Sequence, residues 1–438
     1  MQMPSPTLEK PQDTGSDVEL AHDHTDALHG VSVPSTQQAP QQSRDGGRVA
    51  WLQCANMFCL WFTAWGLVNS FGVFQTYYES HAMIDASSSS ISWIGSLQLC
   101  LFIGGTTVAG PIFDLGYLSC LLITGTILTT LSLMMTSLCS TYWQLLLAQG
   151  VCTGLGMTCL FIPCVAVVPA YFSSRRALAI GVGASGSSIG AIVFTVVFER
   201  LRPRIGFGWT VRVMGFITLA SLLLPAFTMR KLGGRSPARA FIDRSAFQEP
   251  ATVITYASML LVFVGLYIPY FYIQVFAEQE IGENNVNQYL IVILNAGSFF
   301  GRLFPSILAD EIGPVNTIIP CAAISSIVGF CWIAVHDRAG TVAFCVIYGF
   351  FSGSFVSLTA VLWASLCPDV KRMGTRTGMM TVPVAAGLLL GNPIAGQLIR
   401  GGSFVGLQVF CAATVMAAAC LLVAARLSVT GLVIKRKV

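Results

Sequence analysis

Residues 142–169 read YWQLLLAQGVCTGLGMTCLFIPCVAVVP, and none of these side chains is charged. About 20 apolar residues in a row span the hydrocarbon core of a bilayer, so this stretch predicts one transmembrane helix. Similar runs recur along the chain, which predicts an all-α membrane protein with twelve transmembrane helices. The other eleven predicted spans are residues 49–77, 91–113, 118–138, 177–198, 209–229, 251–277, 287–309, 314–335, 341–366, 374–399 and 404–425.

The composition of the 438-residue chain supports a protein whose main partner is a lipid bilayer. Apolar residues make up 54% and charged residues 10%, and the mean hydropathy is +0.71. Such values do not describe a water-soluble surface. The net charge of +4 is small and scattered, which excludes a nucleic-acid partner. The 14 cysteines sit singly in apolar runs without a C-x-x-C pair, so they indicate packing residues rather than a metal site or a disulfide scaffold.

The longest break between predicted spans, residues 230–250, divides the chain into six spans plus six. Residues 1–43 are rich in Ser, Pro and Gln, and they carry six carboxylates but only one basic residue, Lys10. This composition is typical of disorder. We therefore predict five segments. They are a disordered cytoplasmic tail (1–44), an N-terminal six-helix bundle (45–229), a cytoplasmic central loop (230–250), a C-terminal six-helix bundle (251–427) and a basic cytoplasmic tail (428–438).

The distribution of Lys and Arg predicts the orientation in the membrane. If the N-terminus is cytoplasmic, 17 of the 24 basic residues lie on the inner side. Basic residues concentrate in cytoplasmic loops, so both termini are predicted to face the cytoplasm. The cluster of Arg200, Arg202 and Arg204 between the fifth and sixth spans goes against this rule.

An internal repeat marks the inner end of the second span in each half. Gly110-Pro-Ile-Phe-Asp-Leu-Gly116 corresponds to Pro305-Ser-Ile-Leu-Ala-Asp-Glu-Ile-Gly313. Each copy carries one aspartate, and both aspartates are predicted to lie beside the N-terminal ends of the fifth and eleventh helices. Positive helix ends attract carboxylates, so these aspartates could form latches at an inner gate, although ordinary loop charges remain an alternative. The predicted latch residues are Asp114, Asp310, Arg175, Arg176 and Arg376.

Four motifs in order resemble the major facilitator superfamily and, more narrowly, the fungal form of its monocarboxylate-transporter-like branch. They are DGGRVAW at 45–51, NSFGVFQTYY at 69–78, the loop motif at 110–116 and YFSSRRALAIG at 171–181. The resemblance extends from residue 45 to about residue 427. It implies two rocking six-helix bundles, alternating access to a midplane site, no cofactor, a plasma-membrane location and a monomer.

The predicted eighth span holds the clearest candidate ligand site. Arg302 lies deep in this apolar run, where an ionisable residue is costly. Asn295, Ser298 and Arg302 are spaced to share one helix face, and a guanidinium there can hold a carboxylate with two parallel hydrogen bonds. A structural arginine bonded to backbone carbonyls or to a neighbouring helix is the alternative.

The predicted seventh span carries a second polar stripe. Tyr267, Tyr270 and Gln274 have the same helical spacing, and Pro269 between them loosens the backbone ladder. Tyrosines offer an apolar ring with a polar edge, which suits a ligand that is part ring and part polar. A belt of aromatic residues at the membrane interface is the alternative interpretation.

The resemblance also indicates what the substrate is not. Members of this branch that carry lactate with a proton use a lysine in the first span and an aspartate one turn before the arginine of the eighth span. Asn69 and Ser298 occupy those positions here, while Arg302 is kept. A proton-coupled lactate carrier is therefore disfavoured, and Asn69 becomes a candidate pocket residue.

These observations favour efflux of a larger amphipathic organic anion, such as a polyketide-type secondary metabolite. An importer of a monocarboxylate or vitamin, proton-linked or facilitative, and a non-transporting receptor or sensor are the alternatives. The coupling ion, protons included, stays open. An enzyme is not indicated, because the five histidines lie in the tail or in outer loops and form no catalytic cluster.

Overall fold

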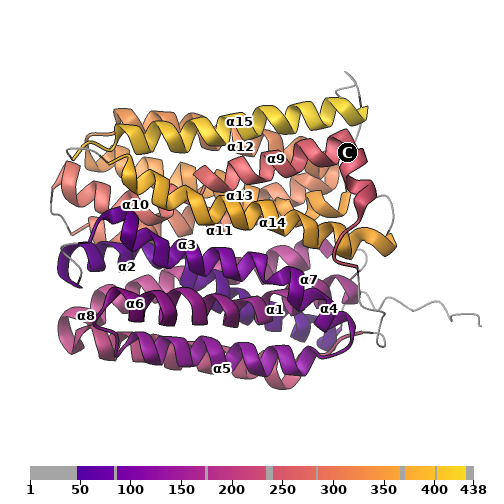
Figure 1. Cartoon of the computed structure of the whole chain (residues 1–438), viewed down its shortest axis with the longest axis horizontal. Coiled ribbons are helices and arrows are strands. Elements are labelled where there is room, and N and C mark those ends of the chain that lie inside the picture. The colour runs from indigo at the N-terminus through magenta and orange to yellow at the C-terminus, as the bar shows by residue number, and fades with distance from the viewer. Residues whose placement is uncertain are drawn as a thin grey trace, which may run out of the picture. The chain divides into compact units, whose positions relative to one another are not determined.

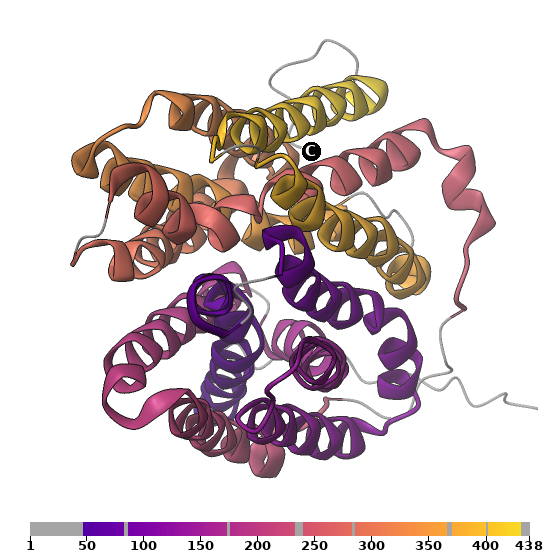
Figure 2. The same ribbon diagram turned by 60° about the vertical axis from the view of Figure 1, so that its left-hand side comes forward.

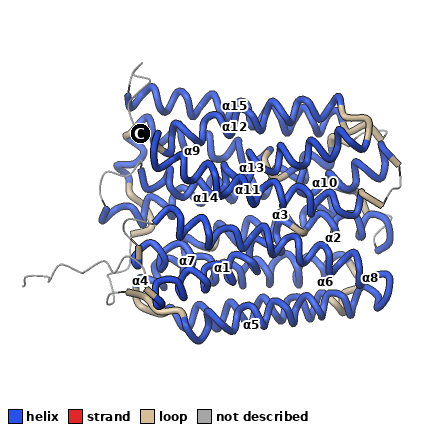
Figure 3. Tube along the Cα trace, turned by 180° about the vertical axis from the view of Figure 1, so that it is seen from behind, coloured by secondary structure: helices blue, strands red, loops and turns tan. Residues whose placement is uncertain are grey.

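The computed structural model describes residues 47–82, 86–172, 176–232, 240–282, 285–365, 370–399 and 402–430. Every regular element within these ranges is helical (Figure 3). The expectation of an all-α membrane protein is therefore confirmed.

The helices of the first half follow the predicted spans closely, and several spans are broken into two or three pieces. The elements are α1 (Arg48–Asn69), α2 (Phe71–Tyr77), η1 (Tyr78–Ala82), α3 (Ser88–Gly104), α4 (Thr106–Asp114), α5 (Leu118–Thr136), α6 (Tyr142–Leu145), η2 (Leu146–Cys152), α7 (Thr153–Tyr171) and α8 (Arg176–Thr228).

The second half begins with a short 3-10 helix that precedes the seventh span. Its elements are η3 (Arg244–Gln248), α9 (Pro250–Gly265), α10 (Ile268–Phe276), η4 (Ala277–Ile281), η5 (Asn287–Tyr289), α11 (Leu290–Ile312), α12 (Pro314–Cys331), η6 (Trp332–Ala334), α13 (Arg338–Ser365), α14 (Val370–Gln397) and α15 (Val405–Thr430). The seventh span is interrupted at residues 266–267, directly before Pro269, as the proline predicted.

Eleven helical stretches in the described residues are long and apolar enough to cross a membrane. One of them belongs to α8, whose 53 residues would extend about 80 Å as a straight helix, far beyond one bilayer. Gly206 interrupts α8 with a φ of 76° and a ψ of 166°, a backbone conformation that favours glycine. The chain turns back there, so α8 supplies two crossings and the total is twelve. Residues 199–205, which follow the predicted fifth span, therefore extend the first of these two helices up to the turn at Gly206.

The helices of the two halves form two neighbouring groups (Figures 1 and 2). Across the boundary between them, α2 packs on α10, α3 on α14 and α8 on α11. We call the end of the bundle that carries the start of α1 the Arg48 end. The opposite end, which carries η1, is called the His81 end.

Candidate functional site

Arg302 lies on α11 with only 1% of its surface exposed. Its Nε donates a hydrogen bond to the Oγ of Ser298 at 3.3 Å, and its Nη1 has no partner among the described residues. Salt bridges within the described ranges do not involve this guanidinium. An unpaired buried charge is strongly unfavourable, so the arrangement is suited to an anion that supplies the missing acceptor.

Aromatic rings from both halves surround this guanidinium. Its central carbon lies 5.9 Å from the ring centroid of Trp61 on α1, a cation–π contact. Tyr267 stacks on Trp65 with centroids 6.1 Å apart, and Tyr270 lies 5.3 Å from Tyr267. Arg302 lies near both tyrosines. We call Arg302, Trp61, Trp65, Tyr267 and Tyr270 the central cluster.

Buried polar atoms without a hydrogen-bond partner among the described residues occur in many helices, and five of them, besides Nη1 of Arg302, belong to residues of α1 and α11. Buried polar groups are normally paired, so unpaired ones are available to a ligand or to water. Asn69, at the end of α1, is fully buried and neither of its amide atoms is bonded. The others are Nε1 of Trp61, Nε1 of Trp65 and Oδ1 of Asn295.

The residues predicted on the face of the eighth span come together as expected from their spacing. Asn295, Ser298 and Arg302 are all buried on α11, and Asn295 donates to the carbonyl of Ile291 at 2.9 Å. Bonds from Arg302 to backbone carbonyls do not occur among the described residues. The second predicted stripe divides, because Tyr267 and Tyr270 join the central cluster whereas Gln274 lies nearer the His81 end.

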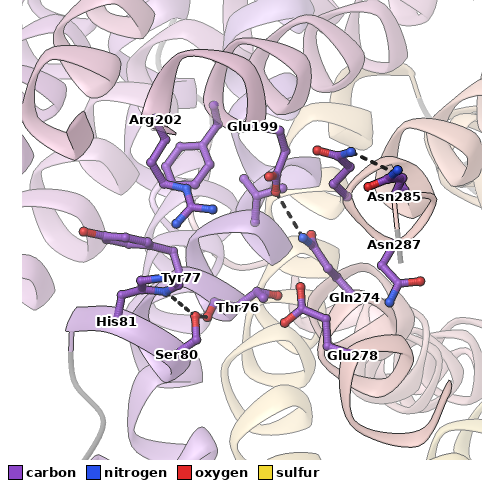
Figure 4. A pocket seen from close by; sticks show the side chains of 13 residues that line it. Thr76, Tyr77, Ser80, His81, Glu199, Arg202, Gln274, Glu278, Asn285 and Asn287 are labelled. Carbon is purple, nitrogen blue, oxygen red and sulfur yellow. Dashed lines mark hydrogen bonds between the residues drawn. The ribbon is translucent and has the colours of Figure 1, made fainter. Parts of the chain in front are cut away.

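A pocket of about 480 Å³ lies at the His81 end between the two halves (Figure 4). At its base, Nε2 of Gln274 on α10 donates to Oε1 of Glu199 on α8 at 3.0 Å. Glu199 is only 8% exposed. Glu199 directly follows the predicted fifth span, and the sequence gives no sign of its burial, since only the packing of α10 reveals it. The pocket is also lined by Thr76, Tyr77, Ser80, His81, Arg202, Glu278, Asn285 and Asn287.

The arginine cluster that departed from the charge rule makes local aromatic contacts at this end. Arg202 lies over the ring of Tyr77 at 5.2 Å, and Arg200 lies over the ring of Tyr289 at 5.6 Å. Arg202 also interacts electrostatically with Glu199. Arg200 and Arg202 therefore have structural contacts at this end. The rule that basic residues concentrate in cytoplasmic loops did not predict them.

At the Arg48 end, Arg376 is held by the segment that precedes α9. Its two terminal nitrogens each donate to one oxygen of Glu249 at 2.7 Å, and its Nε donates to Oδ2 of Asp243 at 3.0 Å. The hydrogen bonds from Arg376 hold the pKa of the Glu249 carboxyl below its usual value. These two acidic partners were missed by sequence reasoning, because the central loop gives no local signal of where it folds.

The other predicted latch residues are described only in part. The side chains of Asp310 and Arg176 and the whole of Arg175 lie outside the described residues. Asp114 ends α4, and its carbonyl accepts a hydrogen bond from Nζ of Lys231 at 3.2 Å. The pairing of these charges therefore stays a prediction.

Residues 49–338 match the family model of the Major Facilitator Superfamily. The chain belongs to this family. It is therefore an integral membrane protein of a transporter family, in keeping with the twelve crossings. The nucleoside transporter NupG has the same fold, with a TM-score of 0.64 at 12% identity over 87% of this chain and 99% of that one.

Fungal transporters are similar in sequence over most of the chain. The MFS-type transporter dbaD of Emericella nidulans is 44% identical over 379 residues, which is 85% of each protein. The aspyridones efflux protein apdF of the same fungus is 35% identical and covers 89% of this chain and 79% of its own. The fujikurins efflux protein of Gibberella fujikuroi is 34% identical, with coverages of 96% and 90%.

Proposed function

We propose that this protein is a secondary active transporter that exports an amphipathic organic anion by alternating access, and that its cargo is a secondary metabolite such as a polyketide-type acid. The observation that carries this proposal is the buried guanidinium of Arg302, whose Nη1 has no partner among the described residues and lies within a cluster of aromatic rings. Two relatives whose names specify efflux of aspyridones and of fujikurins support the direction of transport.

The chemistry of the central cluster defines the class of ligand. Arg302 would bind a carboxylate or an acidic enol, because a guanidinium offers parallel donors to a planar anion. The rings of Trp61, Trp65 and Tyr267 would cover the apolar body of the ligand. Asn69 and Asn295 would bond to its polar substituents, since both amide atoms of Asn69 and Oδ1 of Asn295 lack partners among the described residues. A small acid such as lactate would leave most of these groups uncovered.

The proposed cycle uses the two halves as rocking units. Residues 45–229 would move against residues 251–427, with the Arg48 end facing the cytoplasm of a cell whose plasma membrane holds the protein as a monomer. The aspartates Asp114 and Asp310 would pair with Arg175 and Arg176 and with Arg376 when the inner side closes. The motifs at 45–51 and 171–181 favour the monocarboxylate-transporter-like branch for this chain.

Ligand-dependent thermal stabilisation tests the proposed ligand class. A ligand that binds the folded state raises its stability by an amount set by ligand concentration relative to Kd. We expect large aromatic or polyketide-like acids to raise the melting temperature of the purified protein, and lactate and pyruvate to leave it unchanged at equal concentration. Stabilisation by lactate alone would contradict the proposal, because it would restore the small-acid carrier that Asn69 and Ser298 argue against.

A further inference from the structure

The contact between the two halves at the His81 end has an apolar layer and a polar layer. In the apolar layer, the rings of Phe71 and Phe271 lie 4.7 Å apart, and Gly72 packs so closely on the carbonyl of Tyr270 that a Cβ atom would not fit. The polar layer includes the hydrogen bond between Gln274 and Glu199. Two other hydrogen bonds also join the halves at this end, from Oγ of Ser89 to the carbonyl of Pro393 at 2.8 Å and from the hydroxyl of Tyr272 to the carbonyl of Ser88 at 3.4 Å. Because α2 and α8 belong to one half and α10 to the other, both layers must separate when this end opens.

The polar layer is incomplete as it stands. Gln274 donates one N–H to the carboxylate of Glu199, while Oε1 of the same amide is buried and has no partner in the part of the chain that the structure describes. An ionised carboxylate can only accept hydrogen bonds, whereas a protonated one also donates through its O–H. A carboxylic acid and a primary amide can then form a ring of two hydrogen bonds. Protonation of Glu199 would thus add a bond across the two halves and satisfy the unpaired amide oxygen.

We propose that Glu199 is a proton-binding site that controls opening at the His81 end. With the proton bound, the acid–amide ring holds α8 against α10. Loss of the proton removes one of the two bonds and leaves the amide oxygen of Gln274 buried and unpaired, so the contact weakens. The ligand of this site is a proton, which would reach the carboxylate through the pocket. In the proposed orientation the pocket faces external water, so external acidity would keep the outer gate closed.

The surroundings of Glu199 allow proton exchange and identify the other groups that titrate or carry charge. Glu199 lines the pocket of about 480 Å³, which is large enough to admit water to the carboxylate. Arg202 faces it from the same helix, His81 and Tyr77 from the end of the first span, and Glu278 from η4 (Figure 4). The segment that begins the eighth span contributes three side-chain amides to the pocket lining, those of Asn285, Asn287 and Gln288. In the same segment, the ring of Tyr289 lies under the guanidinium of Arg200.

Hydrogen–deuterium exchange of the full-length protein in lipid nanodiscs tests this proposal without any substrate. Exchange in segments 71–77 and 268–276 is followed at pH 5 and pH 8, with labelling times corrected for intrinsic amide exchange. A net hydrogen bond changes an opening equilibrium on the order of five-fold, so we expect about five-fold less protection at pH 8 than at pH 5. Glu199→Gln, whose amide can form the same two-bond ring, should keep the pH 5 protection at both values.

Control variants separate Glu199 from its titratable neighbours. Glu278 and His81 line the same pocket as Glu199. The variants Glu278→Gln and His81→Asn should therefore retain the pH dependence of the unmodified protein. Glu199→Ala should show the weaker protection at both pH values. The proposal is overturned if the unmodified protein shows no pH dependence, if Glu199→Gln retains it, or if either control abolishes it. None of these outcomes depends on which metabolite is carried or in which direction.

Discussion

Replacing Arg302 with methionine is expected to abolish binding of the anionic ligand and, at the same time, to stabilise the empty protein. Removing one member of a buried, hydrogen-bonded charge pair typically costs several kcal/mol, which corresponds to a loss of affinity on the order of 100-fold or more. In the empty protein the guanidinium is buried with its Nη1 unpaired, so an apolar side chain of similar length relieves a penalty there. The melting temperature without ligand should rise, and its increase with ligand should disappear.

The opposite signs of these two effects separate a binding role from a structural one. A matched control is Arg212 on α8, which also lies within a span, with its Nε bonded to Ser137 at 3.0 Å and its guanidinium 4.8 Å from the ring of Trp209. Arg212→Met should leave the ligand-induced increase intact. If Arg302→Met instead lowers the stability of the empty protein while ligand binding persists, Arg302 is a structural arginine and the ligand binds elsewhere.

The second large effect is expected at Gly190, where α8 crosses α1. A Cβ atom there would lie 2.0 Å from the backbone carbonyl oxygen of Phe62, and a backbone atom cannot move aside as a flexible side chain can. Small residues permit such close crossings in membrane helices. Gly190→Ala should force the helices apart and lower stability by about 1–3 kcal/mol, the usual range for overpacking.

Gly181 provides the control because it lies in the same helix and its nearest neighbour would be 3.7 Å from an added Cβ. Gly181→Ala should leave the melting temperature unchanged or raise it slightly, since alanine favours helix more than glycine does. Equal melting temperatures for the two variants, measured in the same detergent, would show that the α1–α8 crossing tolerates a wider separation than its geometry indicates.

Span number and helix faces could be predicted from the sequence because they depend on local patterns. An apolar run long enough to cross a bilayer is helical wherever it lies, and the spacing of Asn295, Ser298 and Arg302 places them on one face of any helix. The spacing of Tyr267 and Gln274 was equally regular. These two residues nevertheless serve different clusters, because they are seven positions apart along the helix axis and contact different partners.

The remainder of the site depends on contacts between helices that are distant in the sequence. Nothing in the runs around Trp61 and Glu199 indicates that the first meets Arg302 and the second meets Gln274. The continuation of α8 through the Arg200–Arg204 cluster was also missed, since charged residues between two apolar runs suggest a loop. The contacts of Trp61 and Glu199 each join residues more than 70 positions apart.

The measurement that tests the central claim most directly is flux through proteoliposomes of one large aromatic acid and of its neutral primary amide. The pair has nearly the same size and shape, so the two compounds differ mainly in the charge that Arg302 is proposed to bind. We expect flux of the acid, its loss in the Arg302→Met variant, and little flux of the amide in either protein. Equal flux of the acid and the amide, unchanged by Arg302→Met, would contradict anion recognition at the central cluster.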